Sequence, residues 1–262
     1  TKRCNFCSIM MLTDPPWTFP PVELMLNTSS VHVWFAPLDV EDTRLQFYRA
    51  TLSQDERRRA EKFSFDLHRT HFIVGRGILR HILGRYLFVA PDSIRFEYNA
   101  FGKPSLELSP GRAPLYFNMA HSNDCALFAF TLDGAVGVDI EYIRDDIQIE
   151  QTGALVFSTG ELAALGSIPP ERQHHTFFKF WTRKEAYIKG VGQGLTMPLR
   201  QFDVRHTPEQ PVRYEGEAMR SFQPNDWFVR DIDLTEAYCA AVAMQGRAWE
   251  VSMFRLPDVY PF

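Results

Sequence analysis

The sequence alternates twice between helical patterns and groups of short strand-like segments, and this alternation constrains the fold more than any other feature. Apolar residues at helical spacing predict helices, and short alternating apolar segments predict strands. One predicted helix begins at Ser53, and three others cover residues 69–89, 157–165 and 176–189. The predicted strands are residues 31–35, 94–98, 115–119, 125–131, 135–141, 202–204, 212–214, 228–231 and 238–244. Each half of the chain therefore combines helices with antiparallel strands, which is typical of the α+β class.

Length, charge and cysteine content exclude several kinds of protein. The chain has 262 residues, enough for one large domain or two small ones. Its formal net charge is -4 and it carries no basic stripe, so nucleic acid is not an expected partner. No apolar run reaches the length of a transmembrane helix, so we expect no membrane association. Four cysteines are too few for a disulfide scaffold and indicate reduced thiols in a cytoplasmic protein.

The N-terminal segment has a composition of its own. Residues 13–22 are rich in proline and predict an extended arm. The apolar stretch Ser8–Leu12 is too short for a secretory signal. Cys4 and Cys7 form a CxxC pair, but no second pair completes a zinc site.

Two carboxylates alternate within the segment Gly137–Glu141. In a strand, Val138 and Ile140 would enter the core, while Asp139 and Glu141 would point together to the other face, roughly 7 Å apart. Paired carboxylates repel each other unless a cation or base lies between them, and oxygen ligands suit a hard ion such as magnesium. An exposed strand face with incidental acids is the alternative, and this pentapeptide alone favours it.

The helical segment Phe177–Lys189 carries a third carboxylate and an ammonium group. Glu185 and Lys189 are one turn apart and share a helix face with Trp181. A solvent-exposed salt bridge is one interpretation of this pair. Aromatic neighbours that prefer burial indicate a cleft instead, and such groups beside a metal suit phosphate chemistry. The following GVGQG at 190–194 lacks a preceding strand, so it predicts a helix C-cap and a loop rather than a dinucleotide site.

Two serine–glutamate pairs have the spacing of a capping box, in which each side chain bonds a backbone N–H of the other residue. Ser53 with Glu56 begins the first predicted helix, and Ser158 with Glu161 begins a later one. This structural role is sufficient by itself to explain Glu161. Two further segments carry polar groups: His121 ends a predicted strand, and Lys103 lies on the turn 99–104, where an exposed turn lysine is the simplest interpretation.

In this order and spacing, the segments together resemble the Sfp-type 4'-phosphopantetheinyl transferases. The matching segments are GKP at 102–104, FNMAHS at 117–122, GVDIE at 137–141, FSTGE at 157–161 and WTRKEAYIKGVGQGL at 181–195. The resemblance covers most of the chain from about residue 31 and includes the helical segment HRTHFIVGRGILR. It implies a monomeric pseudo-dimer of two similar α+β subdomains, with the active site in the cleft between them. We therefore expect an arm at 1–22, an N-terminal subdomain at 23–134 and a C-terminal subdomain at 135–262.

The resemblance also implies an activity and roles for the acidic residues. The 4'-phosphopantetheine moiety of coenzyme A is transferred to a serine of an apo acyl or peptidyl carrier protein, giving the holo form and 3',5'-ADP. Asp139, Glu141 and Glu185 match the ligands of a magnesium ion, and Lys189 matches a lysine on the phosphates that assists the leaving group. Either Glu161 or Glu185 matches the base that deprotonates the serine. Fatty-acid, polyketide and nonribosomal peptide pathways remain open.

The resemblance further implies a set of residues that hold coenzyme A: Arg59, Arg69, His71, Lys103, Ala120, His121 and Lys189. His121 matches a residue at the 3'-phosphate. Ala120 replaces a serine that is common in the family, so only a backbone contact would survive there. His71 stands where the family often has arginine, and a neutral histidine holds phosphate less firmly near pH 7.

Two other functions fit the same residues. Three carboxylates and a lysine would suit another magnesium-dependent nucleotide transferase or hydrolase. A module that binds carrier domains without catalysis is the non-enzymatic alternative, although the intact acid set argues against it. A purely structural domain would leave five motif matches in order unexplained.

Overall fold

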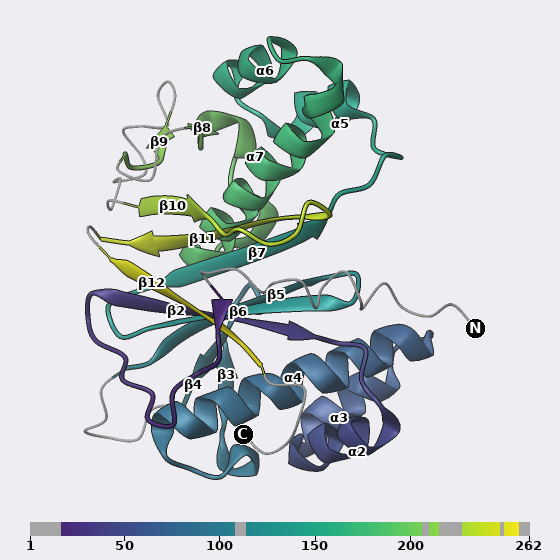
Figure 1. Ribbon diagram of the computed structural model, residues 1–262, viewed down its shortest axis with the longest axis vertical. Coiled ribbons are helices and arrows are strands. Elements are labelled where there is room, and N and C mark those ends of the chain that lie inside the picture. Colours follow the sequence, from purple (N-terminus) through teal and green to yellow (C-terminus); the bar gives the residue numbers. More distant parts are fainter. Residues whose placement is uncertain (1–16, 108–113, 206–209, 215–226, 247–248, 257–262) are drawn as a thin grey trace.

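The computed structural model describes residues 17–107, 114–205, 210–214, 227–246 and 249–256. The CxxC pair and most of the predicted arm lie outside these residues. Figure 1 shows helices on both outer sides of the molecule with strands between them. Within the described part of the chain, no helix is both long enough and apolar enough to cross a membrane.

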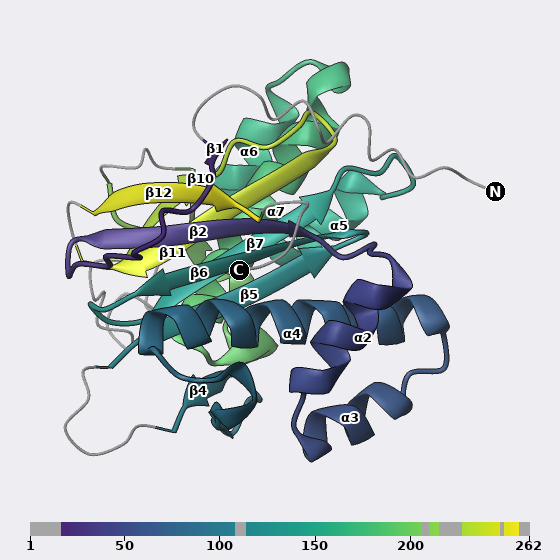
Figure 2. The same cartoon turned by 60° about the horizontal axis from the view of Figure 1, so that its bottom comes forward.

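The first sheet has five strands and is covered by the helices of the first half of the chain. Its order is β1 (Trp17–Thr18), β12 (Glu250–Arg255), β2 (Ser30–Pro37), β6 (Cys125–Thr131) and β5 (Tyr116–Ser122). Strand β12 is parallel to both of its neighbours, whereas β2, β6 and β5 pair antiparallel. The helices over one face are α2 (Asp42–Thr51), α3 (Gln54–Glu61) and α4 (Asp66–Leu87). Figure 2 shows α4 lying along the sheet, with α2 and α3 at one end of it.

The second sheet has three antiparallel strands, β10 (Trp227–Asp231), β11 (Tyr238–Gln245) and β7 (Val136–Tyr142). Successive side chains along each strand point to opposite faces of this sheet. Val138 of β7 and Val242 of β11 pack against the first sheet, whereas Ala241 packs toward the helices. The helices of this half are α5 (Ile149–Val156), α6 (Thr159–Gly166) and α7 (Pro170–Val191).

Two short hairpins and three 3-10 helices complete the described elements. The hairpins are β3 (Phe96–Tyr98) with β4 (Pro104–Leu106), and β8 (Phe202–Asp203) with β9 (Arg213–Tyr214). The 3-10 helices are η1 (Pro91–Ser93), η2 (Gly194–Thr196) and η3 (Leu199–Gln201). Gly192 ends α7 in the left-handed conformation with a φ of 78°, as the glycine-rich segment predicts.

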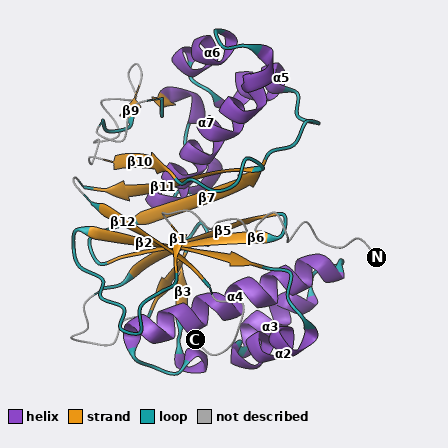
Figure 3. Ribbon diagram, viewed as in Figure 1, coloured by secondary structure: helices purple, strands orange, loops and turns teal. Residues whose placement is uncertain are grey.

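The two halves repeat one order of elements, which confirms the predicted α+β pseudo-dimer. A strand is followed by three helices, a short hairpin and two more strands, first from β2 to β6 and then from β7 to β11. In both halves the last strand pairs antiparallel with the first strand of that half. Figure 3 shows the result, with helices outside and strands between them.

Several sequence-based expectations differ from the structure. The segments 202–204 and 212–214 form their own hairpin and do not join the sheet of β10 and β11. Helix α5 and strand β12 were not predicted, and α7 begins at Pro170 rather than at residue 176. Strand β12 lies within the expected C-terminal subdomain 135–262 but pairs with β2 in the first sheet. Pairing across such a sequence separation leaves no local pattern in the sequence.

Candidate active site

A close contact between β7 and α7 places one acidic strand face against one helix face. A Cβ atom on Gly137 would overlap the carbonyl oxygen of Ala186 and the backbone of Gly190. The strand and the helix therefore touch backbone to backbone at this point. Asp139 is two residues further along the strand, so its side chain lies on the same face.

Asp139 and Lys189 form the central contact of the site. The Lys189 ammonium donates to Asp139 Oδ1 over 2.5 Å. The Asp139 side chain is only 3% exposed, whereas that of Lys189 is 32% exposed, so a ligand can reach the lysine. Burial acts to lower the pKa of Lys189, but Asp139, Glu185 and Glu141 together raise it above its ordinary value. The lysine therefore remains a cation at neutral pH.

Glu141 is held at the edge of the site by two donors. The Trp181 indole N–H donates to its Oε1 over 3.3 Å, and the Ser122 hydroxyl donates to its Oε2 over 2.9 Å. Trp181 comes from α7 and Ser122 from the end of β5, so both halves of the chain orient this carboxylate.

Two carboxylate oxygens of the site are buried without a hydrogen-bond partner, Asp139 Oδ2 and Glu185 Oε1. Burial raises the pKa of Asp139 to about 7; Lys189 acts to lower it, and Glu141 and Glu185 add to the rise. Burial likewise raises the pKa of Glu185, with Lys189 opposing and Glu141 adding to the shift. The three acids are thus close enough to repel one another, and two of them have spare acceptor atoms.

The described residues contain no group of three or more His, Cys, Asp and Glu side chains already arranged to hold a metal ion. Lys189 takes one oxygen of Asp139, and Trp181 and Ser122 take those of Glu141. The structure therefore brings the predicted acids together without forming a closed ligand set. The unpartnered oxygens of Asp139 and Glu185 are nevertheless the hard donors that a magnesium ion prefers.

Three histidines lie near one another beside the site. Burial lowers the pKa of His121, and His71, Lys189 and His68 lower it further. The pKa of His71 is also lowered, chiefly by burial and in part by His68, although Asp124 acts to raise it. His71 Nε2 is buried without a partner. The structure thus brings His71 and His121 together at one end of the site.

The expected coenzyme A residues on α3, α4 and β5 have different surroundings. The Arg59 guanidinium lies 5.5 Å from the centre of the Phe72 ring. Arg69 donates to Asp66 Oδ1 over 2.6 Å and to the carbonyl oxygen of residue 63 over 3.0 Å. The Ala120 side chain is buried between the two sheets, so only its backbone could contact a ligand.

Lys103 is not the exposed turn lysine that its sequence context suggests. Its ammonium donates to the carbonyl oxygens of Gly190 over 2.7 Å and Val136 over 3.2 Å. Asn99, at the start of the same turn, donates to the carbonyl oxygen of Gly192 over 2.9 Å. Burial lowers the pKa of Lys103 to about 8. The turn of the first half therefore contacts the end of α7, and the Lys103 ammonium already has two acceptors.

Glu161 lies in the packing of α6 against α7 and does not join the other acids. Its Oε1 accepts from the Val204 N–H, and its Oε2 accepts from the Ser158 N–H, both over 2.8 Å. Its Oε2 also pairs with the Lys184 ammonium over 2.8 Å, and both side chains are 0% exposed. The predicted capping box is confirmed. A substrate serine has no access to this carboxylate, so its position does not support the catalytic role.

The sequence reasoning missed Ser122 and Lys184. Each lies in one of the family motifs, Ser122 beside His121 and Lys184 beside Glu185, but the motif predicted a role only for the neighbouring residue. The burial and orientation of these two side chains depend on the folded chain, so the motif alone does not predict either role.

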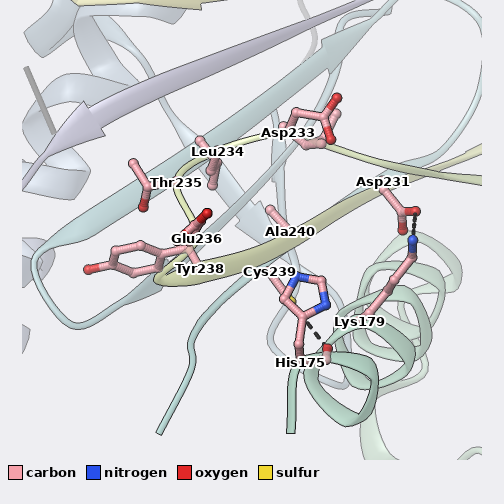
Figure 4. Close-up of a pocket in the computed structure, with 11 residues that line it drawn as sticks. His175, Lys179, Asp231, Asp233, Leu234, Thr235, Glu236, Tyr238, Cys239 and Ala240 are labelled. Atoms are coloured by element: carbon pink, nitrogen blue, oxygen red, sulfur yellow. Dashed lines mark hydrogen bonds and ion pairs between the residues drawn. The ribbon is translucent and has the colours of Figure 1, made fainter. Parts of the chain in front are cut away.

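A separate pocket of about 240 Å³ lies beside the first turns of α7. Figure 4 shows Lys179 of α7 facing Asp231 of β10, with Cys239 and His175 to one side of them. Lys179 pairs with Asp231 over 2.9 Å. None of the predicted site residues lines this pocket.

Fold and site together define a class of protein. The family model described as the 4'-phosphopantetheinyl transferase superfamily matches residues 135–243, and the model of the N-terminal part of 4'-phosphopantetheinyl transferases matches residues 39–132. The chain belongs to the 4'-phosphopantetheinyl transferase superfamily. It is a transferase that moves 4'-phosphopantetheine to carrier proteins, which confirms the resemblance drawn from the motifs.

Particular relatives span most of the chain. The chain is 37% identical to the 4'-phosphopantetheinyl transferase HetI of Nostoc sp. over 234 residues, which cover 89% of this chain and 95% of HetI. It is 27% identical to a putative 4'-phosphopantetheinyl transferase of Synechocystis sp., over 88% of this chain and 94% of that protein. It is 34% identical to the 4'-phosphopantetheinyl transferase psf-1 of Bacillus pumilus, over 64% of this chain and 71% of that protein.

Proposed function

We propose that this transferase uses coenzyme A and magnesium to convert an apo acyl or peptidyl carrier protein into its holo form, releasing 3',5'-ADP. The reaction takes place between β7 and α7, at Asp139, Glu141, Glu185 and Lys189. We expect the protein to act in the cytoplasm. A single chain is sufficient for the site, because Ser122 of the first half holds Glu141 of β7 in the second half.

The observation that carries the metal proposal is the pair of buried oxygens without a partner, on Asp139 and Glu185. Buried acceptors are rarely left unpaired unless a ligand or ion completes them. Asp139, Glu141 and Glu185 would hold the ion. When bound there, magnesium supplies charge neutralisation for the pyrophosphate of coenzyme A.

Lys189 is well suited to stabilise the negative charge of the departing phosphate. Its neighbouring acids keep it protonated, and its side chain is partly exposed. The serine oxygen forms a new bond to the β-phosphorus, and the bond from that phosphorus to the 3',5'-ADP oxygen breaks. A cation positioned beside that oxygen stabilises the charge that develops on it.

Glu185 is the carboxylate best placed to take the serine proton. It lies among the acids of the site, and burial raises its pKa above its ordinary value, which favours proton uptake. Glu161, the other expected base, has both oxygens engaged inside the protein.

The nucleotide end of coenzyme A would lie toward His121 and His71. His121 is close enough to Lys189 for its pKa to respond to the lysine, so one ligand can reach both residues. Arg69 has a buried Nε without a partner and is the cation of α4 nearest in sequence to His71. These groups suit a phosphate, although two histidines of lowered pKa hold it chiefly by hydrogen bonds.

The test is to incubate the chain with coenzyme A, magnesium and several apo carrier proteins, and to weigh the carriers by mass spectrometry. We expect a mass gain of one phosphopantetheine group, which is lost when EDTA replaces magnesium. Phosphate release from nucleoside triphosphates without a carrier would support the other transferase or hydrolase. Tight carrier binding with no mass gain would support the non-catalytic module.

A further inference from the structure

Lys184 is a fully buried lysine immediately before Glu185 in α7. Its ammonium pairs with Glu161 over 2.8 Å and donates to the carbonyl oxygens of Leu199 and Phe202, each over 2.7 Å. It also lies 4.1 Å from the centre of the Phe202 ring. A buried ammonium is strongly unfavourable unless its three protons are accepted, and here they are. The Lys184–Glu161 pair is therefore fully buried and fully hydrogen-bonded, unlike a surface ion pair.

The partners of Lys184 come from three separate elements. Glu161 and Ser158 form the capping box of α6, while Leu199 begins η3 and Phe202 begins β8. The Ser158 hydroxyl also donates to Asp203 Oδ2 over 3.1 Å. We call Ser158, Glu161, Lys184 and the two carbonyl groups the α7 anchor. It ties the middle of α7 to both chain segments that flank it in space.

The α7 anchor lies next to the functional face of the same helix. Lys184 precedes Glu185 directly, and Lys189 is about one turn further on. A helix transmits rotation and translation along its axis, so the place of Lys184 fixes the direction of Glu185 and Lys189. On another face of α7, Arg183 pairs with Asp231 of β10 over 2.6 Å. Lys179 pairs with the same carboxylate over 2.9 Å (Figure 4).

We propose that Glu161 and Lys184 are positioning residues, which set the rotation and height of α7 so that Glu185 and Lys189 face Asp139. The proposal rests on the proposed function, and it replaces the role of general base that the sequence suggested for Glu161. A displacement of about 1 Å at a reacting group can reduce turnover about 100-fold, so a modest loosening of α7 is sufficient to reduce activity.

The first half of the chain offers a matched control. Glu56 of the capping box of α3 pairs with Arg80 of α4 over 2.7 Å, with both side chains at most 5% exposed. Arg80 also donates to the carbonyl oxygens of Pro91, which begins η1, and Ile94, which follows it. This pair resembles the α7 anchor in charge and burial, although Glu56 also pairs with Arg76 over 3.2 Å. Helix α4 carries none of the proposed metal ligands.

The experiment compares Glu161→Gln and Lys184→Met with Glu56→Gln and Arg80→Met. For each variant, kcat and the KM for coenzyme A are measured per folded molecule, with melting temperature and the pH dependence of kcat. Amide hydrogen exchange of α7 is measured without coenzyme A or metal. We expect both α7 anchor variants to lose about 10- to 100-fold in kcat, with an unchanged KM and pH profile and faster exchange in α7. The controls should melt lower and keep kcat.

Two results would overturn the proposal. Unchanged kcat per folded molecule in Glu161→Gln and Lys184→Met would leave the pair a purely structural role. Loss of the acidic limb of the pH profile in Glu161→Gln, with normal exchange in α7 and normal turnover in Lys184→Met, would make Glu161 the base. If wild type adds no mass to any carrier, the proposed function fails, while hydrogen exchange still tests the anchor.

A milder pair of variants covers the case in which the charged residues are required for folding. Ser158→Ala removes one cap of the α7 anchor and leaves its ion pair, and Ser53→Ala does the same in the first half. Each loses the hydroxyl that accepts from a backbone N–H at the start of its helix, and Ser158→Ala also loses the bond to Asp203. We expect kcat to fall only in Ser158→Ala. Equal kcat in the two variants would count against the proposal.

Discussion

In both halves of the chain, a short helix that begins with a serine–glutamate capping box packs against a helix of 22 residues. Glu56 pairs with Arg80 in the first half, and Glu161 pairs with Lys184 in the second. Arg80 and Lys184 are each the fifteenth residue of their helix. Each also donates to the carbonyl groups of the first residue of a later 3-10 helix and of the residue after that helix, at η1 and η3 respectively. The framework is therefore the same in both halves.

The halves differ where the first strand faces its long helix. In the first half, Trp34 of β2 is fully buried, and Tyr86 accepts a hydrogen bond from its indole over 3.0 Å. The Arg85 guanidinium lies 5.8 Å from the Trp34 ring. In the second half, Asp139 of β7 meets Lys189 of α7.

The glycines sharpen this difference. In the second half, Gly137 and Gly190 bring the backbones of β7 and α7 into contact. In the first half, His32 and Tyr86 fill the space between β2 and α4 and contact each other over 2.7 Å. In the first half, the contact between the first strand and the long helix is thus aromatic packing. In the second half, the same contact contains buried acids with unpartnered oxygens. The buried acids of the site thus come from the second copy of the framework, whereas the first copy has aromatic side chains at the equivalent place.

The largest predicted effect separates the two copies directly. We expect Asp139→Ala to reduce carrier modification by at least about 100-fold, because Lys189 loses its partner and the proposed metal loses a ligand. Trp34→Phe should lower the melting temperature and leave turnover near that of wild type. Mass spectrometry of the carrier and thermal unfolding measure the two effects. Near-normal turnover in Asp139→Ala would refute the assignment of the acids.

The stability of the first half should depend on pH through His32, which contacts Tyr86. Burial lowers the pKa of His32 from 6.5 to about 4, so the unfolded chain binds this proton more tightly than the folded chain. The stabilisation is complete above pH 6.5 and is lost as the pH falls from there toward 4. The loss amounts to about 3 kcal/mol in the free energy of unfolding. Urea unfolding of wild type and His32→Phe measures it; parallel pH curves for the two proteins would contradict the prediction.

The smallest predicted effect tests the backbone contact. Gly137→Ala should cost about 1–3 kcal/mol and move β7 away from α7, since its Cβ has no space. Gly166→Ala is the matched control, because a Cβ there meets no atom within 4 Å. Thermal unfolding and turnover measure both variants. Equal stability of the two variants would show that the contact adapts without cost.

The local features of the fold could be read from the sequence. Alternation placed Asp139 and Glu141 on one face of a strand, and both capping boxes are formed as predicted. These features depend on hydrogen bonds and side-chain directions within a few residues, so a short pattern contains the information. The order of the motifs was also sufficient to indicate the family.

The long-range partners could not be read in the same way. Lys103 reaches Gly190, and β12 returns to β2, because of contacts between distant parts of the chain. The same holds for Glu161, whose sequence context fits both a cap and a base.

By itself, the sequence determined many of the elements, the acids and the chemistry available to them. Only the tertiary structure decided that Glu161 is sealed against Lys184 and that Asp139 meets Lys189. The physical reason is burial, because whether a carboxylate is paired inside the protein or left with a spare oxygen depends on which distant groups pack around it.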